Sequence, residues 1–352
     1  MARDVVQDIE KVPLFVKPSM DDYRGNLVGR GGFGSVYKVG DIVEKLIPVG
    51  RILVKRATRT YLNIPLSGPD TVIYTDSLDT VIQEINPEAF KNSLREDEVH
   101  KDISGQPHIP RRLGYHFMAI APLGVEGVSN LYAVHSQEYI LGNNFQDLIR
   151  TKMPFHVIMK ILSGIGLAIE NIHLKGFTHG DIKPGNAIIS GEGRNIKSYV
   201  IDFGTSRTQY TVVDKFIFTP EYASPEHAHG WLVPQIDDMA FGLSLHEALT
   251  GTNFFSGRYR NPDGSFIDNA VLNHMLWLRD SYSESDAANI VGDTREKSLL
   301  VYQQVLPSRF LEALEISLHP EYQKREGTPL QQEIAKLAKK TKPRRKRTFG
   351  LF

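Results

Sequence analysis

The hydrophobic period of this sequence changes near residue 140, and that change constrains the fold more than any other feature. Before it, short apolar stretches are separated by Gly turns, as in NLVGRGGFGSVYKVGDIVEKLIPV, which predicts two or three strands. After it, apolar residues recur at helical spacing, as in FHVIMKILSGIGLAIENIHLKG. A strand-rich part followed by a helix-rich part predicts an α+β fold with two lobes and a cleft between them.

Several stretches predict single elements. Gly40-Asp41 predicts a hairpin turn, PEAFKNSLREDEVHKDI predicts a helix, and LYAVHSQEYIL predicts a strand. The long helix after that strand should end at Gly176, and DDMAFGLSLHEALTG predicts a second apolar helix that also ends at a Gly. Residues 48–87 and 256–300 have no clear period, so we expect insertions with modest local structure there.

Composition excludes several classes of protein. Cysteine is absent, which excludes disulfides, thiolate metal sites and a Cys nucleophile. No run of 18 apolar residues occurs, which predicts no membrane span, and the N-terminus does not resemble a secretory signal. The formal net charge is zero, so we expect no direct binding of nucleic acid by the folded part. Together these features predict a cytoplasmic and/or nuclear protein.

The zero net charge conceals a basic end. Residues 326–352 hold eight Lys or Arg and two Glu, a local charge of +6, so the rest of the chain carries −6. A run of like charge with Pro is typical of a solvated tail, and it equally fits a nuclear-import signal or a patch for an anionic partner. We therefore predict a basic tail over 327–352.

The stretch VGRGGFGSV has the pattern GxGxxG at Gly29, Gly31 and Gly34, with Gly32 and Phe33 at its tip. In a dinucleotide-binding fingerprint such glycines open a helix, whereas here they lie between two predicted strands. A flexible strand-turn-strand can lay backbone N–H groups over phosphates without a side chain in the way.

A Lys on the following strand would complete a phosphate site. Lys45 lies in IVEKLI with Val43 and Ile47 at alternating positions, and Lys55 in ILVKRA has the same local pattern. We favour Lys45 because the Gly-Asp hairpin leads directly into its strand.

A second set of polar residues follows the long helix, in HGDIKPGNAIIS and VIDFGTSR. Asn186 and Asp202 would supply the oxygen ligands that Mg²⁺ prefers. Asp181 could accept a proton from an attacking hydroxyl, and Lys183 could neutralise a moving phosphate. The later HAH, His227 to His229, has no Cys or acidic partner nearby and is expected at the surface.

Over residues 24–326 the chain resembles a eukaryotic-type protein kinase. GRGGFGSV is similar to the Gly-rich loop, HGDIKPGN to the catalytic loop, DFG to the metal-binding motif and TPEYASPE to the end of the activation segment. DDMAFG is similar to the start of the buried helix that anchors the catalytic loop through Asp237. The resemblance implies these parts: extension 1–23, N-lobe about 24–137, hinge about 138–142, C-lobe about 143–326 and tail 327–352.

The resemblance also implies a serine/threonine protein kinase that uses ATP and Mg²⁺ and phosphorylates a protein substrate. Asp181 would orient or deprotonate the hydroxyl, Lys183 would contact the γ-phosphate, and Asn186 and Asp202 would hold Mg²⁺. Thr219 would bridge Asp181 and Lys183, the pattern of Ser/Thr specificity. The implied ATP contacts and their supporting residues are Gly29, Gly31, Gly32, Phe33, Gly34, Val36, Val43, Lys45, Glu98, Glu138, Ile140 and Ile188.

The chain departs from the kinase pattern at a few positions. The helix Glu that pairs with Lys45 can be Glu96 or Glu98, and we predict Glu98. Gly180 replaces the Arg that normally binds a phosphate on the activation loop. We therefore expect activity without loop phosphorylation, with Arg207 as an alternative ligand for such a phosphate.

Two further departures concern the end of the activation segment. Ser224 stands for the usual Ala, a small change, and Arg325 is expected to pair with Glu226 although its spacing is loose.

Two other functions compete with the kinase interpretation. Aminoglycoside or choline phosphotransferases share the catalytic Asp, the Asn and a later Asp, but they lack a stretch like TPEYASPE. A nucleotide-binding pseudokinase scaffold is the other alternative, and the complete set of Lys45, Asp181, Asn186 and Asp202 argues against it.

Overall fold

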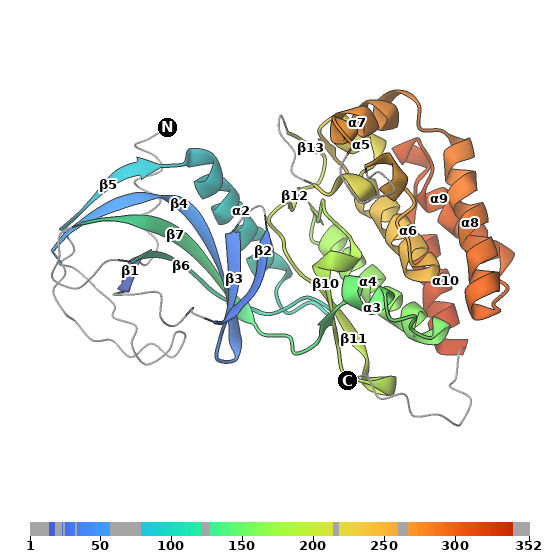
Figure 1. Ribbon diagram of the computed structural model, residues 1–352, viewed down its shortest axis with the longest axis horizontal. Coiled ribbons are helices and arrows are strands. Elements are labelled where there is room, and N and C mark those ends of the chain that lie inside the picture. The colour runs from blue at the N-terminus through green and yellow to red at the C-terminus, as the bar shows by residue number, and fades with distance from the viewer. Residues whose placement is uncertain are drawn as a thin grey trace. The chain divides into compact units, whose positions relative to one another are not determined.

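The computed structural model describes residues 14–17, 23, 25–31, 34–56, 79–120, 127–213, 218–259 and 267–340. They form two compact units: an N-terminal unit of Met1–Gly105 and Pro110–Tyr139, and a C-terminal unit of Gln106–Ile109 and Ile140–Phe352. Strands dominate the first unit and helices the second (Figure 1), which confirms the predicted α+β class. The division falls beside the predicted change of period.

The described strands of the N-terminal unit form one sheet in the order β1-β6-β7-β4-β3-β2, with β5 also paired to β4. Strand β1 runs parallel to β6, and the other pairs are antiparallel. Gly40 and Asp41 connect β3 to β4, which confirms the predicted hairpin. The strands are β1 (Leu14–Lys17), β2 (Leu27–Gly31), β3 (Gly34–Val39), β4 (Ile42–Arg56), β5 (Asp79–Ile85), β6 (Arg112–Ile120) and β7 (Gly127–Glu138).

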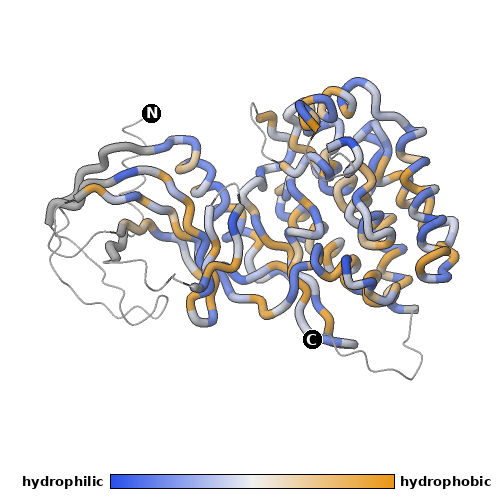
Figure 2. The backbone as a smooth tube through the Cα atoms, viewed as in Figure 1, coloured by the Kyte–Doolittle hydropathy of each residue, from blue (hydrophilic) through white to orange (hydrophobic). Residues whose placement is uncertain are grey.

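The register of β3 and β4 separates the two faces of the sheet. Val36 lies directly opposite Lys45, so both side chains point to one face, together with Val43 two residues away. Leu46 points to the other face, where it packs in a buried cluster with Tyr23, Met118 and Val134. Hydrophobic and hydrophilic residues are interspersed along the strands of this unit in Figure 2.

Helix α2 (Pro87–Ile103) is the helix described in the N-terminal unit, and it confirms the predicted one. Asn86 caps its first turn by accepting a hydrogen bond from the Ala89 N–H at 3.0 Å, and Pro87 occupies the first position, where its missing N–H costs nothing. The buried face of α2 carries the residues Phe90, Ser93, Glu96, Val99, His100 and Ile103.

The C-terminal unit is built from helices with short strand pairs between them (Figure 1). The helices are α3 (Phe145–Ile149), α4 (Phe155–Leu174), α5 (Pro225–Ala228), α6 (Gln235–Thr250), α7 (Ala270–Asp280), α8 (Glu284–Tyr302), α9 (Ser308–Ser317) and α10 (Gly327–Lys340). The strands are β8 (Asn143–Asn144), β9 (Phe177–Thr178), β10 (Ala187–Ser190), β11 (Lys197–Val200), β12 (Arg207–Thr208), β13 (Thr211–Val212) and β14 (Trp231–Leu232). Single 3₁₀ turns are η2 (Pro184–Asn186), η3 (Gly193–Asn195), η4 (Pro220–Tyr222), η5 (Ser256–Arg258) and η6 (Tyr322–Lys324).

Helices α4 and α6 form the core of the C-terminal unit, as the sequence predicts. Gly176 and Gly251 follow their last turns with φ of +82° and +78°, a conformation that favours glycine. By length and composition α4 could also cross a membrane, but most of its apolar residues are buried inside the unit. A buried core helix passes the same test.

The prediction of modest local structure over 256–300 is wrong, because α7 and α8 occupy most of that range. The buried face of α8 consists of Ala287, Ile290, Thr294 and Ser298. These small and polar residues give almost no hydrophobic period, which explains why the sequence does not reveal the helix. Of 48–87, residues 57–78 lie outside the described part, and the rest forms parts of β4, α2 and β5.

The predicted tail begins too early, because residues 327–340 form α10. Leu330 and Ile334 of this helix are fully buried, and α10 packs against α4 and α9. The α4–α10 contact is close at Gly166, where a Cβ atom would lie 2.9 Å from Gln331 Cγ. The C-terminal unit therefore includes α10, and residues 341–352 of the predicted tail lie outside the described part.

Candidate active site

A β-hairpin places two of the predicted metal ligands at the same end of two paired strands. Ala187 of β10 lies opposite Val200 of β11. Asn186 directly precedes β10 and Asp202 follows β11, and the Ile201 N–H donates to the Asn186 carbonyl oxygen at 2.9 Å. The register thus brings together two residues that are separated by the whole hairpin in the sequence.

Asp237, at the start of α6, holds the backbone of the HGD stretch. Its two carboxylate oxygens accept hydrogen bonds from the N–H groups of His179 and Gly180, each at 2.8 Å. The structure thus confirms the anchor that the sequence predicts. Gly180 has a φ of +83°, which any residue with a Cβ adopts at a cost. The glycine is therefore favoured by the backbone as well as being a departure from the kinase pattern.

His173 completes the anchor, and the sequence gives no signal for it. Its Nε2 lies 2.9 Å from an Asp237 carboxylate oxygen. Burial by itself would lower the pKa of His173, but the hydrogen bond and the charge of Asp237 outweigh burial, and the pKa is raised. Burial likewise opposes the charged form of Asp237, yet the contacts with His173 hold its pKa below the ordinary value. The two side chains form an ion pair in which Asp237 is buried and His173 is half-buried.

The ion pair predicts a pH-dependent stability. A raised folded-state pKa means that His173 stabilises the folded state fully at pH values below its ordinary pKa of 6.5. This contribution, about 1.4 kcal/mol for each unit of pKa shift, is lost as the pH rises through the folded-state pKa. Denaturant unfolding at increasing pH should show wild type losing stability relative to His173→Gln. His156→Gln, which removes an imidazole at the start of α4, is the control, and parallel curves for wild type and His173→Gln would contradict the assignment.

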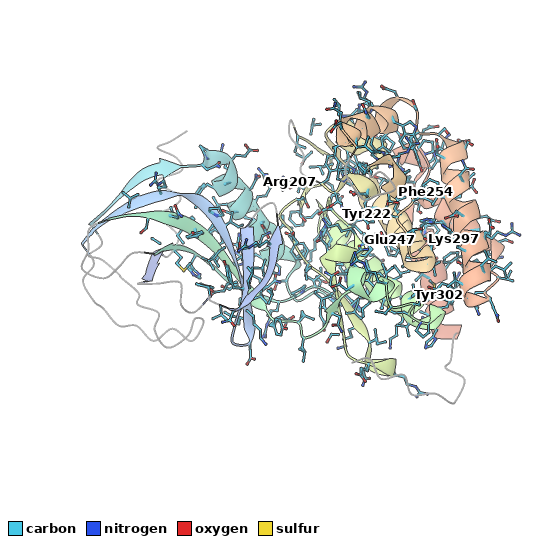
Figure 3. The ribbon with its side chains drawn as sticks, viewed as in Figure 1. Arg207, Tyr222, Glu247, Phe254, Lys297 and Tyr302 are labelled. Atoms are coloured by element: carbon cyan, nitrogen blue, oxygen red, sulfur yellow. The ribbon has the colours of Figure 1, made fainter. Side chains whose placement is uncertain are left out.

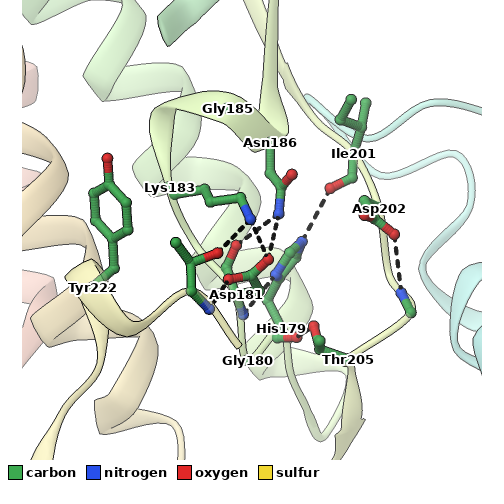
Figure 4. A network of polar contacts seen from close by, with 12 residues as sticks. His179, Gly180, Asp181, Lys183, Gly185, Asn186, Ile201, Asp202, Thr205 and Tyr222 are labelled. Carbon is green, nitrogen blue, oxygen red and sulfur yellow. Dashed lines mark hydrogen bonds and ion pairs between the residues drawn. The ribbon is translucent and has the colours of Figure 1, made fainter. Parts of the chain in front are cut away.

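Asp181, Lys183 and Thr219 lie in contact, as the sequence predicts (Figure 4). Lys183 Nζ donates to Asp181 Oδ2 at 2.7 Å and also to the Thr219 hydroxyl oxygen. The Thr219 N–H donates to Asp181 Oδ1 at 2.9 Å. The carboxylate is therefore fixed from both sides, and one cation lies beside it.

The side-chain oxygens of Asn186 and Asp202 are suitable ligands for Mg²⁺. Asn186 uses its side-chain nitrogen for hydrogen bonds to the Asp181 carbonyl oxygen at 2.8 Å and to Asp181 Oδ2 at 3.1 Å. This orientation leaves the Asn186 amide oxygen as the available ligand atom. Asp202, with a φ of +65°, accepts a 3.4 Å hydrogen bond from the Gly204 N–H. One amide oxygen and one carboxylate are hard ligands that fit a hard cation.

In the N-terminal unit, Lys45 pairs with Glu96 and not with the predicted Glu98. Lys45 Nζ lies 2.7 Å from Glu96 Oε1, and both side chains are largely buried. Glu98 is exposed. The prediction of Glu98 is thus wrong for a reason of helical phase: Glu96 shares the buried face with Phe90 and Val99, whereas a residue two positions on points away.

The correction makes a direct prediction about catalysis. Glu96→Gln removes the charge that holds Lys45, and we expect at least a tenfold loss of kcat/KM, or ~1.4 kcal/mol. Glu98→Gln, an identical change on the exposed side of the same helix, is the matched control and should retain wild-type kinetics. Steady-state phosphate-transfer assays on both variants measure these kinetics and test the pairing of Lys45 with Glu96. Equal losses, or a loss only at Glu98, would contradict the pairing.

The other predicted ATP-binding residues are distributed over both units. Gly29 lies opposite Val36 and Gly31 opposite Gly34, and a Cβ atom at Gly34 would lie 2.3 Å from the Leu46 carbonyl oxygen. Gly32 and Phe33 lie outside the described residues. Ile188 is half-buried on β10 of the C-terminal unit.

Two backbone N–H groups of the predicted hinge form hydrogen bonds within the N-terminal unit. The Glu138 N–H donates to the Arg111 carbonyl oxygen at 3.0 Å, and the Tyr139 N–H donates to the Asp41 carbonyl oxygen at 3.1 Å. Of the two hinge residues among the predicted ATP contacts, Glu138 and Ile140, Ile140 is thus the one whose N–H has no hydrogen-bond partner within the described residues.

Tyr222 and Glu247 form a buried contact that sequence reasoning missed (Figure 3). The Tyr222 hydroxyl donates to Glu247 Oε2, and Gln146 Nε2 donates to Glu247 Oε1. Burial and then the charge of Glu247 raise the pKa of Tyr222. Tyr222 lies in the TPEYASPE stretch, but no signal in the sequence connects it to a Glu on α6.

The expectation of surface histidines in HAH is wrong for His227, which is buried. Its Nδ1 accepts from the Ser224 N–H at 3.0 Å, so its Nε2 carries the proton and faces the Gly180 carbonyl oxygen at 3.4 Å. Burial lowers the pKa of His227, which keeps the ring neutral. The side chain connects α5 to the HGD stretch. His229, in contrast, is exposed, as the sequence predicts, and it stacks on Trp231.

Comparison with known proteins agrees with this geometry. A family model described as a protein kinase domain matches residues 80–332; the match begins after the Gly-rich stretch and Lys45. The probable serine/threonine-protein kinase PknB of Bifidobacterium longum is 28% identical over 244 residues, which cover 66% of this chain and 30% of that relative.

Two other relatives match shorter parts. The serine/threonine-protein kinase PrkC of Bacillus subtilis is 34% identical over 149 residues, covering 40% of this chain and 22% of that relative. The serine/threonine-protein kinase pkn2 of Myxococcus xanthus is 30% identical over 140 residues, covering 37% of this chain and 17% of that relative. The chain spans less than a third of the length of these relatives. Because the family model matches well over half of the sequence, the chain belongs to the protein kinase family.

Proposed function

We propose that the protein is a serine/threonine protein kinase, which transfers the γ-phosphate of ATP to Ser or Thr hydroxyls of a protein substrate in the presence of Mg²⁺. The observation that carries this proposal is the contact of Asp181, Lys183 and Thr219. Thr219 begins the TPEYASPE stretch, so the segment expected to receive a peptide is bonded directly to the expected catalytic carboxylate.

The proposed mechanism assigns each side chain a task that its contacts permit. Asp181 orients the acceptor hydroxyl and accepts its proton as the bond to phosphorus forms. Lys183, already beside that carboxylate, stabilises the negative charge on the phosphoryl group during transfer. Lys45, held by Glu96, contacts the α- and β-phosphates.

Asn186 and Asp202 would hold the metal ion, through one amide oxygen and one carboxylate. Mg²⁺ supplies neutralisation of phosphate charge when it is bound. The hydrogen bonds from Asn186 to Asp181 couple the proposed metal ligand to the proposed base, so one loop orients both.

The names of the relatives support a protein as the acceptor of the phosphate. The stretch TPEYASPE supports it independently, because the small-molecule phosphotransferases lack such a stretch. The small-molecule alternative is tested by offering radiolabelled ATP and Mg²⁺ with generic protein substrates, with aminoglycosides and with choline. We expect label in protein alone. Label in an aminoglycoside or choline but never in protein would favour the rival class, and nucleotide binding without any transfer would favour a pseudokinase.

The basic end of the chain adds a second proposal. Residues 341–352 lie outside the described part, so their role as a nuclear-import signal or a site for an anionic partner remains a prediction. Deleting these residues should change the location of the protein in the cell or its binding partners and leave phosphate transfer intact. α10 must be kept in such a deletion, because its buried residues belong to the C-terminal unit.

A further inference from the structure

The segment after Asp202 is paired with the rest of the C-terminal unit at residues 207–208 and 211–212. Arg207 and Thr208 of β12 pair with β9, which directly precedes the HGD stretch. Thr211 and Val212 of β13 pair with β14, which follows α5. The residues between these two strand pairs, 209–210, therefore lie in the first half of the activation segment between two points of attachment.

Gln209 lies between the two strand pairs and makes three hydrogen bonds. Its backbone N–H donates to the Gly176 carbonyl oxygen at 2.9 Å. Its side-chain nitrogen donates to the carbonyl oxygens of His173 at 2.8 Å and Phe177 at 3.1 Å. A single side chain thus bonds one carbonyl in the last turn of α4 and one on β9, and it connects the segment to the polypeptide that leads into the HGD stretch.

The contact point matters because His173 itself is part of the anchor. The His173 ring contacts Asp237, and Asp237 holds the N–H groups of His179 and Gly180. Gln209 therefore connects the activation segment, through His173, to the backbone that carries Asp181. Gly180 has no side chain, so this position offers no cation for a phosphate on the segment.

We propose that Gln209 is the positioning residue that holds the activation segment in place without phosphorylation. The amide bridges the segment and the end of α4, the task that an ion pair between a phosphate and an Arg performs elsewhere. This inference rests on the proposed kinase function, because the effect of Gln209 is measured as a change in the rate of phosphate transfer.

Two substitutions test the proposal. Gln209→Glu keeps the shape of the side chain but replaces both donors with an acceptor that repels the two carbonyls. Gln209→Leu removes the donors without adding charge. Gln304→Glu makes the same change at an exposed position on a loop and is the matched control. All proteins are treated with phosphatase, and intact mass verifies that no phosphate remains.

The wild type without phosphate should be active. Both Gln209 variants should lose about tenfold to a hundredfold in kcat for a protein substrate, as expected for two lost hydrogen bonds. The KM for ATP should stay within about twofold, Tm should change little, and Gln304→Glu should behave as wild type. A purely structural role of Gln209 would not lower kcat while leaving the KM for ATP unchanged.

Three results would overturn the inference. Full activity in both Gln209 variants would show that the amide is dispensable. Activity only in wild type that carries phosphate on Thr208 or Thr211 would show that phosphorylation holds the segment. A loss that vanishes when the assay temperature is lowered well below the Tm of the variant would reveal general destabilisation. If wild type transfers phosphate to no protein at all, the proposed function fails instead.

Discussion

Asp181→Asn is expected to lower kcat for protein phosphorylation by about a hundredfold to ten-thousandfold. The substitution removes the proton acceptor. It also places an amide where the carboxylate now receives hydrogen bonds from Lys183, Asn186 and the Thr219 N–H, so at least one of these donors must face another donor. Steady-state kinetics measures the loss, and calorimetric titration should show ATP binding within a few-fold of wild type.

Asp147→Asn is the control for the Asp181 experiment. Asp147 is exposed in the first turn of α3, and the substitution makes the same chemical change outside the proposed site. Wild-type kcat is expected there. If Asp181→Asn retained wild-type kcat, the proposed base would be wrong even if protein were the acceptor.

The second large effect is on stability, at the buried pair of Arg325 and Glu226. Arg325 Nη1 donates to Glu226 Oε2, its Nε donates to the His319 carbonyl oxygen, and its Nη2 donates to the Pro320 carbonyl oxygen at 2.7 Å. Both side chains are almost completely buried. The pairing that the sequence predicts is thus confirmed.

Removing one partner leaves the other charge buried and unpaired. Arg325→Met should lower the free energy of unfolding by about 3–5 kcal/mol, measured by urea titration. The double variant Arg325→Met with Glu226→Gln should be less destabilised than the sum of the two single variants. Lys336→Met, which breaks the surface ion pair of Lys336 with Glu333 on α10, is the control and should stay within about 0.5 kcal/mol of wild type. Simple additivity would contradict direct coupling of Arg325 and Glu226.

Short motifs with fixed spacing account for most of the site that the sequence predicts. The contact of Asp181, Lys183 and Thr219 and the anchor at Asp237 follow from residue identity within HGDIKPGN, TPEYASPE and DDMAFG. Alternation of apolar residues and the Gly40-Asp41 turn predict the strand that carries Lys45. These features are local, so a single sequence contains them.

Features that depend on tertiary packing are not predictable in the same way. The choice between Glu96 and Glu98 depends on the phase of the buried face of α2, which the two charged residues do not themselves reveal. α8 buries small and polar side chains and therefore has no clear hydrophobic period. The bonds made by Gln209 and His227 join segments far apart in the chain, and their partners are mostly backbone atoms, which carry no sequence signal.

The central claim is that the protein transfers phosphate from ATP to protein hydroxyls with Asp181 as the proton acceptor, and phosphoamino-acid analysis tests it most directly. Wild type and Asp181→Asn are each incubated with radiolabelled ATP, Mg²⁺ and a degenerate peptide library, and the labelled amino acids are separated. We expect phosphoserine or phosphothreonine with wild type and almost no label with Asp181→Asn. Equal labelling by both proteins, or label only in phosphotyrosine, would contradict the account.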